Sequence, residues 1–259
     1  SGPTIISAVA CVFGSLANAG SGSAFGNSGN ITLGDSASFA SINYTGTVPT
    51  ATDRLLTLGG AGGGVINNNG FGAISFNNAG SAVSGTAGNR TLTLGGTYTG
   101  GANIFAGQLT DMTGSSTKLQ IGNLSSVNSQ WTITGNNSHS GGTTINSSGS
   151  GATLNIGSAN ALGTGPLFVG NNCNLDNTTG GDLAVNNALA LTNGILTYLG
   201  SANNMTINGA VTLSNASRTI TVNAKALALG GVVGEDATPR SLTKAGAGTL
   251  LLLGANTYS

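Results

Sequence analysis

Residues 242–259 read LTKAGAGTLLLLGANTYS, and two earlier stretches resemble this one. They are LTLGGTYTGGANI at 92–104 and WTITGNNSHSGGTTI at 131–145. Each stretch combines a short apolar or alternating run with a turn rich in Gly, Asn, Ser and Thr that carries one ring side chain. Alternation with period two predicts a strand with one buried face. Recurrence of the same unit predicts a repeat architecture of short strands and turns.

The repeat unit can be aligned residue by residue. Residues 135–140 align with residues 254–259 without a gap, and residues 95–99 give the same pattern one residue shorter. At about 20 residues per coil, the separations from Tyr98 to His139 and from His139 to Tyr258 predict about two and six turns of a solenoid. We assign a structural role in this repeat to Gly95, Thr97, Tyr98, Gly100, Gly101, Gly135, Asn137, His139, Gly141, Gly142, Gly248, Gly254, Asn256 and Tyr258.

Seven short bursts of alternating residues predict strands elsewhere in the chain. They are LLTL at 55, TLTL at 91, WTIT at 131, ATLNI at 152, NMTI at 204, TITV at 219 and ALAL at 226. Gly-Gly, Asn-Gly and Asn-Asn pairs between them favour turns, and little helix is expected. Irregular repeat lengths favour a parallel β-helix over a propeller. Twelve or so coils at about 4.8 Å would form a rod of roughly 55 Å.

The composition excludes several classes of function. The 259 residues include 45 Gly, seven basic and seven acidic residues, so the formal net charge is zero. Because 39% of the residues are apolar, the chain can bury a core despite its few charges. It lacks the basic cluster that nucleic-acid binding requires. The chain has no run of eighteen apolar residues, so no membrane-spanning helix is predicted.

The two cysteines and the first residues allow a limited interpretation. Cys11 and Cys173 have no zinc-ligand spacing, and about eight coils would separate them, so we expect two small buried side chains instead of a disulfide. Thr4–Gly20 predicts a first strand pair or end cap, with a remnant of a secretion signal as the second interpretation. We therefore divide the chain into residues 1–50, a cap or first coils, and residues 51–259, which continue the same domain as irregular repeats.

Residues 242–259, taken with 136–169, resemble the autotransporter-associated β-strand repeat, also called the passenger-associated transport repeat. The resemblance is close from about Trp131 to the end, weaker between Arg54 and Ile104, and absent over the first fifty residues. It implies an extracellular right-handed parallel β-helix on a bacterial cell surface, serving as a stalk, spacer or adhesive surface. It implies no catalytic residue and no cofactor.

The alternative class is a carbohydrate-binding or carbohydrate-cleaving β-helix, for which paired carboxylates would be required. The candidates are Asp176 with Asp182, Glu235 with Asp236, and Asp53 beside Arg54. Asp176 and Asp182 lie in a Gly-rich stretch where Asp suits a turn, and residues 234–240 are expected to form a solvated loop between two strands. His139 is the single histidine, so a catalytic or metal site with two histidines cannot form within one chain. We expect no enzyme, no metal and no cofactor.

The last six residues of the quoted stretch indicate which binding partners to expect. GANTYS has no proline and no charged residue to block pairing at a strand edge. We therefore expect other copies stacked end to end in a filament, or further repeats of a longer chain, with surface glycans as a further candidate partner. The expected function is a structural segment of a bacterial surface fibre or passenger stalk.

Overall fold

The protein is described by a computed structural model over residues 2–7, 9–36, 38–122, 129–146 and 151–259. Within these residues it forms 26 β-strands and no helix. The strands pair in parallel with partners one coil away, as β9 does with β7 and β11. The all-β solenoid expected from the alternating bursts is confirmed, and each of the seven bursts contains a strand.

The strands form four sheets. The ten-stranded sheet contains β2 (Ala10–Phe13), β4 (Ala40–Tyr44), β7 (Gly64–Asn68), β9 (Arg90–Gly96), β11 (Thr117–Ile121), β13 (Thr143–Ile145), β15 (Leu167–Val169), β18 (Leu189–Leu191), β21 (Val211–Leu213) and β24 (Val233–Glu235). The nine-stranded sheet contains β5 (Thr50–Thr52), β8 (Ile74–Phe76), β10 (Asn103–Phe105), β12 (Gln130–Ile133), β14 (Ala152–Ile156), β16 (Cys173–Asn177), β19 (Ile195–Tyr198), β22 (Arg218–Val222) and β25 (Leu242–Ala245). The three-stranded sheet contains β1 (Thr4–Ile6), β3 (Ile31–Leu33) and β6 (Leu56–Leu58), and the four-stranded sheet contains β17 (Leu183–Val185), β20 (Met205–Ile207), β23 (Ala226–Leu229) and β26 (Thr249–Leu252).

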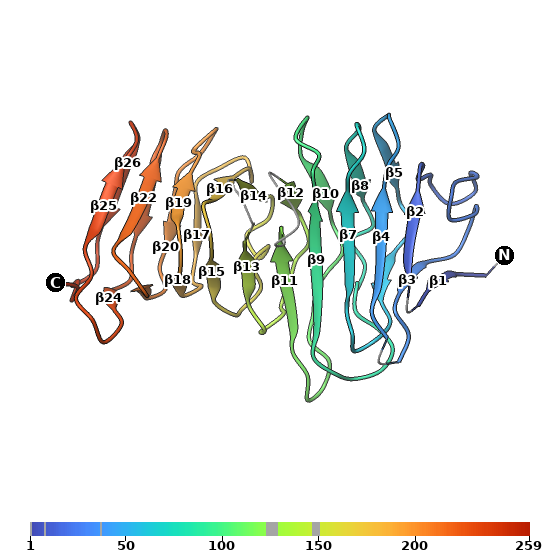
Figure 1. The fold of residues 1–259 in the computed structure, drawn as a ribbon, viewed down its shortest axis with the longest axis horizontal. Helices are drawn as coiled ribbons and strands as arrows, with labels where there is room; N and C mark the ends of the chain where they lie inside the picture. Colours follow the sequence, from blue (N-terminus) through green and yellow to red (C-terminus); the bar gives the residue numbers. More distant parts are fainter. Residues whose placement is uncertain (1, 8, 37, 123–128, 147–150) are drawn as a thin grey trace.

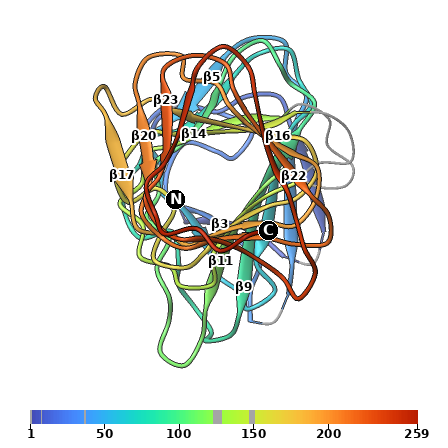
Figure 2. The same cartoon turned by 90° about the vertical axis from the view of Figure 1, so that its left-hand side faces the viewer.

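Consecutive strands belong to different sheets, so the chain winds around one axis from the N-terminal to the C-terminal end (Figure 1). In the C-terminal half a coil passes through the nine-stranded, the four-stranded and the ten-stranded sheet, as β16, β17 and β18 do. Seen from the C-terminal end, the chain runs counterclockwise as it approaches the viewer (Figure 2). The solenoid is therefore right-handed.

The coils are longer and fewer than the sequence predicted. Ile66 pairs with Leu94 and Leu191 pairs with Leu213, and the first of these coils is clearly longer than the second. Because loops of different length leave the strands in register, a fixed repeat of about 20 residues underestimated the coil. The ten-stranded sheet gives ten levels and not twelve, so the rod is about 45 Å long.

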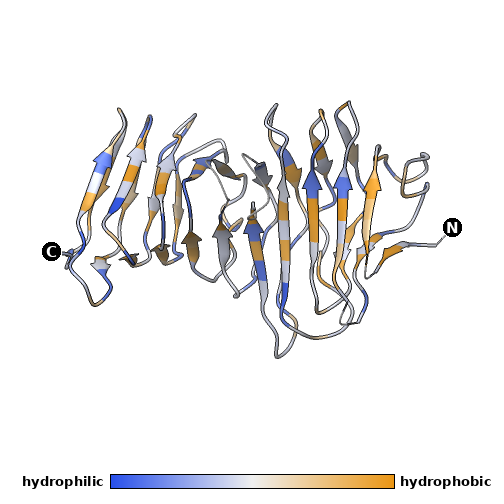
Figure 3. Cartoon of the chain, viewed as in Figure 1, coloured by the Kyte–Doolittle hydropathy of each residue, from blue (hydrophilic) through white to orange (hydrophobic). Residues whose placement is uncertain are grey.

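The core consists of apolar columns that run along the axis. Inward-facing positions of paired strands share one face, so each column gains one side chain per coil. The clearest column, buried throughout, is Ile42, Ile66, Leu94, Ile121, Ile145, Val169, Leu191 and Leu213. Figure 3 shows the corresponding apolar bands on neighbouring strands. Each buried side chain contributes about 1.5–3 kcal/mol, so stability grows with coil number.

The N-terminal end of the core is covered by residues 14–29. Phe25 is buried there, with its ring centroid 4.9 Å from that of Phe13. Arg54 fixes this segment, because its Nε donates to Gly29 O at 2.7 Å and its Nη1 to Phe25 O at 2.7 Å. Leu16 N donates to Thr50 Oγ1, which places the same segment beside β5, the first strand of the nine-stranded sheet.

The cysteines lie in different sheets and do not form a disulfide. Cys11 is in β2 and Cys173 in β16, about six coils or 29 Å apart, instead of the expected eight coils. Cys173 is buried, but Cys11 is only half-buried. Among the residues described, no helix is long and apolar enough to cross a membrane.

Candidate functional site

The aligned repeat residues form one kind of corner, where the chain enters the ten-stranded sheet. Asn137 Oδ1 accepts the backbone N–H of Leu109 at 2.8 Å, and Asn256 Oδ1 accepts that of Val233 at 2.8 Å. The residue after each Asn donates its own N–H to the same residue of the previous coil. Asn256 therefore fastens its turn to the start of β24, whereas Asn137 fastens its turn to Leu109, in the segment between β10 and β11.

The ring residues of these corners are His139 and Tyr258, which are five coils apart and not six. Five levels of the ten-stranded sheet separate them, namely β13, β15, β18, β21 and β24. Gly135 and Gly254 have similar surroundings, because a Cβ on either would lie 2.3–2.4 Å from a glycine carbonyl oxygen of the previous coil. Backbone therefore passes too close for any side chain at these two positions.

The stretch at Tyr98 occupies a different corner, so its alignment with the other two is corrected. It follows β9 and leads to β10, on the exit from the ten-stranded sheet. The N–H groups of Thr97 and Tyr98 donate to Asn68 O at 2.9 and 3.1 Å. Gly95 O accepts the indole N–H of Trp131 at 3.2 Å. Similar turn chemistry serves two corners of one coil, which sequence similarity alone does not distinguish.

The remaining repeat glycines lie at turns. Gly141 precedes β13, and its Cβ would lie 2.5 Å from Thr117 O. Gly142 has φ of +88°, a conformation that suits glycine. Gly248 donates its N–H to Val222 O at 2.7 Å just before β26. Gly100 and Gly101 form the loop before β10, beside the ring of Tyr98.

His139 is fully buried and neutral at physiological pH. Thr143 Oγ1 donates to Leu162 O at 3.0 Å, so its lone pair accepts from His139 Nε2 at 3.1 Å. This assigns the ring proton to Nε2 and leaves Nδ1 buried without a hydrogen-bond partner among the described residues. Burial lowers the pKa of His139 to about 4, an effect that the nearby carboxylate of Asp111 partly opposes. The ring is a structural part of the corner.

Acidification is expected to destabilise the solenoid through His139. Because the folded-state pKa is about 4 and the ordinary value is 6.5, the unfolded chain takes up the proton first. The stability that neutral His139 contributes is present above about pH 6.5 and decreases as the pH falls through 4. The loss amounts to about 3 kcal/mol. Urea unfolding at pH 7 and pH 4.5 should show most of this decrease in the native chain and little of it in His139→Gln, and an equal decrease in both would contradict the assignment.

Asparagine side chains on the surface form ladders between coils. In each pair, Nδ2 of the later residue donates to Oδ1 of the earlier one, one coil away. The pairs are Asn69 to Asn43 at 2.9 Å, Asn160 to Asn136 at 2.6 Å, Asn193 to Asn171 at 2.6 Å and Asn208 to Asn186 at 3.1 Å. The sequence showed many asparagines but not which of them stack, because stacking depends on the unequal coil lengths.

The carboxylates proposed as a catalytic pair have separate structural bonds. Asp176 is buried in strand β16 and not in the expected turn, with Oδ1 accepting the N–H of Ser201 at 3.1 Å and Oδ2 accepting the hydroxyl of the same residue. Asp182 is exposed and accepts the backbone and side-chain N–H groups of Asn204, both at 2.9 Å. These bonds lower the pKa of Asp182. Both carboxylates connect one coil to the next.

The other acidic candidates also have structural hydrogen-bond partners. Glu235 accepts the N–H of Arg240 and, at 2.9 Å, the hydroxyl of Ser259. Asp236 forms an ion pair with Arg240 at 3.0 Å, and hydrogen bonds from this guanidinium are the main reason that its pKa falls to about 2. Asp53 Oδ1 accepts the N–H of Ala19 at 2.8 Å, so it holds the segment that covers the N-terminal end.

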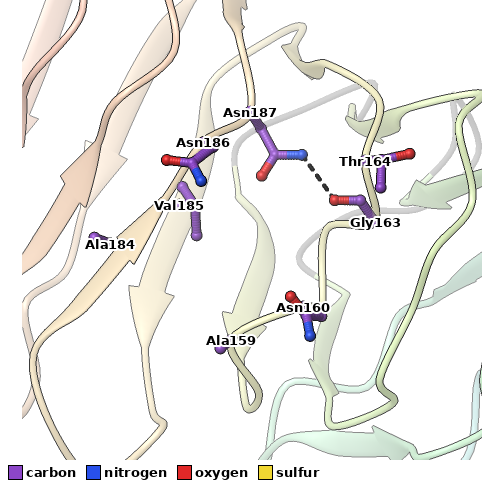
Figure 4. Close-up of a pocket in the computed structure, with 8 residues that line it drawn as sticks. All are labelled: Ala159, Asn160, Gly163, Thr164, Ala184, Val185, Asn186 and Asn187. Carbon is purple, nitrogen blue, oxygen red and sulfur yellow. Dashed lines mark hydrogen bonds between the residues drawn. The ribbon is translucent and has the colours of Figure 1, made fainter.

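A hollow of about 310 Å³ lies on the surface where the four-stranded sheet begins (Figure 4). Its lining residues are Ala159, Asn160, Gly163, Thr164, Ala184, Val185, Asn186 and Asn187. None of them is charged, and Asn187 Nδ2 donates to Gly163 O at 3.1 Å across one side. Such a lining can offer amide and hydroxyl hydrogen bonds to a neutral ligand.

The described residues contain no group of three or more His, Cys, Asp or Glu that could hold a metal ion. Their polar side chains mainly connect one coil to the next, in ladders or corners. Comparisons with protein-family models, with curated proteins and with solved structures find no match for this chain.

Proposed function

We propose that the protein is a structural, extracellular segment of a bacterial surface fibre or of an autotransporter-like passenger stalk. The observation that carries the proposal is the in-register ladder of the ten-stranded sheet, to which every coil contributes a strand. Backbone ladders, apolar columns and asparagine ladders all run along one axis and need no cofactor. Such a rod holds its two ends a fixed distance apart, which is what a stalk or spacer requires.

The C-terminal coil presents an exposed apolar face. Leu252 pairs with Leu229, which is fully buried, yet Leu252 itself is 38% exposed. Leu250, at the register position of Leu227, is also only partly buried. A further coil would complete these columns. The proposal allows that coil to come from a longer chain or from another copy stacked end to end.

The N-terminal end disfavours head-to-tail docking of another copy. Residues 14–29 lie beside β5, where a preceding strand of the nine-stranded sheet would pair. A copy docking there would have to displace Phe25 and the hydrogen bonds from Arg54. In the C-terminal coil, moreover, Lys244 occupies the inward position that Ile220 fills one level earlier. An added coil must therefore provide room or a polar partner for an ammonium group.

Substitution of the exposed inward leucine tests the C-terminal face. We expect the isolated chain to associate weakly at high concentration through this face, and Leu252→Glu to suppress the association by placing a carboxylate in the column. Thr249→Glu is the matched control, since Thr249 lies in the same strand at a position that alternates with the inward ones. Light scattering over a concentration series measures the effect. Equal association of the two variants would show that the leucine column is not the contact.

Electron microscopy distinguishes the two modes of extension. Single rods of about 45 Å would support a segment of a longer stalk, whereas ordered filaments with a rise near about 48 Å would support end-to-end stacking. Immunogold labelling of intact producing cells tests location separately. Label on the outer surface is expected, and label confined to the cytoplasm would overturn the proposed surface role.

A further inference from the structure

Two asparagine ladders stop at opposite sides of the hollow in Figure 4. On one side Asn160 Nδ2 donates to Asn136, so its Oδ1 remains as an acceptor. On the other side Asn186 Oδ1 accepts from Asn208, so its Nδ2 remains as a donor. Figure 4 shows this oxygen and this nitrogen both turned toward the space between them. No described residue supplies a partner to either group.

The interruption follows from the fold at this level. The four-stranded sheet begins at β17, whereas the coil before it has a turn at the same side. In that turn Ala161 N donates to Ser158 O at 3.1 Å and Gly163 N to Asn160 O at 3.0 Å. A turn diverges from the neighbouring strand, so side chains of the two coils cannot stack there. The break in the ladder is thus built into the backbone.

The free groups define the chemistry that would fill the gap. A ligand must accept a hydrogen bond from Asn186 and donate one to Asn160, as one amide group can. Methyl groups of Ala159, Ala184 and Val185 line the hollow and would contact an apolar substituent on that amide. The hydroxyl of Thr164 offers a further polar contact. Because no lining side chain is charged, the ligand should be neutral.

We propose that this hollow binds the acetamido group of an N-acetylhexosamine in a glycan. An acetamido group supplies one carbonyl, one N–H and one methyl, and the attached pyranose supplies hydroxyls. A volume of about 310 Å³ is at the small end for a ligand pocket and suits a single sugar ring. The binding site is independent of the proposed stalk role, so absence of binding would leave that role untouched.

A pair of disaccharides tests the ligand class. Isotope-labelled protein is titrated with N,N′-diacetylchitobiose and with cellobiose, which has the same linkage and no acetamido groups, while NMR follows the side-chain amides. We expect a dissociation constant of about 1 mM for the first and at least tenfold weaker binding for the second. Equal binding of both sugars would overturn the acetamido assignment, as would absence of binding of both.

Two isosteric substitutions test the location. Asn186→Asp keeps the oxygen that accepts from Asn208 but replaces the donor with a second oxygen, so we expect at least a tenfold loss of chitobiose affinity. Asn193→Asp changes a ladder residue outside the hollow and should leave affinity unchanged. Binding retained by Asn186→Asp would overturn the site. Tighter binding of a short asparagine-containing peptide than of chitobiose would reassign the hollow to a side-chain amide.

Discussion

Arg90→Met is expected to lower the free energy of unfolding by about 2–4 kcal/mol. Arg90 is only 2% exposed, and its Nη1 donates to Leu58 O and to Ser84 O, both at 2.9 Å. Its Nη2 donates to Thr86 O. Methionine has a similar length but no donor, so these carbonyl oxygens would lose their partner. Burial also lowers the pKa of Arg90, because the guanidinium is partly desolvated in the native state.

The substitution is measured by urea unfolding with Trp131 fluorescence, because this single tryptophan is fully buried. Arg240→Met is the matched control, since Arg240 forms an ion pair with Asp236 at the surface and should cause a much smaller change. Arg90→Lys should fall between them, because an ammonium group cannot reach all of these carbonyls. A loss in Arg90→Met no larger than that in the control would show that the carbonyl contacts contribute little.

Buried arginines were not predicted from the sequence. Arg54 was considered only beside Asp53, as part of an acidic candidate, yet it donates to carbonyl oxygens of residues 25–29. Arg218 likewise donates to Thr192 O at 2.9 Å. Their acceptors are backbone groups from other parts of the coil, and every residue has such a group. The sequence therefore contains no motif that marks which arginine is buried.

The fold itself was predictable because its main determinant is local. Two or three alternating residues, as in TITV at 219–222, decide which side chains face inward, and in-register stacking repeats that choice in every coil. Coil length was not predictable, because extra residues in a loop that leaves the sheet do not disturb strand pairing. Strands pair in register across the longer coil from Ile66 to Leu94 and across the shorter coil from Leu191 to Leu213. That error made the coil count too high.

The corners were predicted in part for the same reason. Asn137 and Asn256 could be aligned from the sequence because both precede a ring residue by two positions. In the structure, both accept a hydrogen bond from the previous coil. The hollow beside Asn186 could not be foreseen, because it depends on which coil first contributes a strand to the four-stranded sheet. A change of topology between neighbouring coils leaves no residue pattern of its own.

Gly96→Ala is expected to destabilise the protein by about 3 kcal/mol or more. Gly96 ends β9 with φ of +116°, and a Cβ there would lie 2.1 Å from Asn68 O and 2.4 Å from Asn68 N. Asn68 cannot move freely, because its side chain is buried and donates to Asn103 Oδ1 at 2.6 Å and to Gly72 O at 2.9 Å. Asn103 Oδ1 in turn accepts the N–H of Ile74 at 3.0 Å. The added methyl would thus disturb two neighbouring coils.

Two glycines of one turn separate backbone strain from this close approach. Gly180 has φ of +90° with open space around it, so Gly180→Ala should cost only the strain, about 1–2 kcal/mol. Gly181 lies outside that region of φ and also faces open space, so Gly181→Ala should change stability by less than about 0.5 kcal/mol. Urea unfolding followed by circular dichroism gives the three values. If Gly96→Ala lowered the free energy of unfolding no more than Gly180→Ala does, the backbone of Asn68 would have to move without loss of its buried hydrogen bonds. That result would refute rigid stacking of these coils.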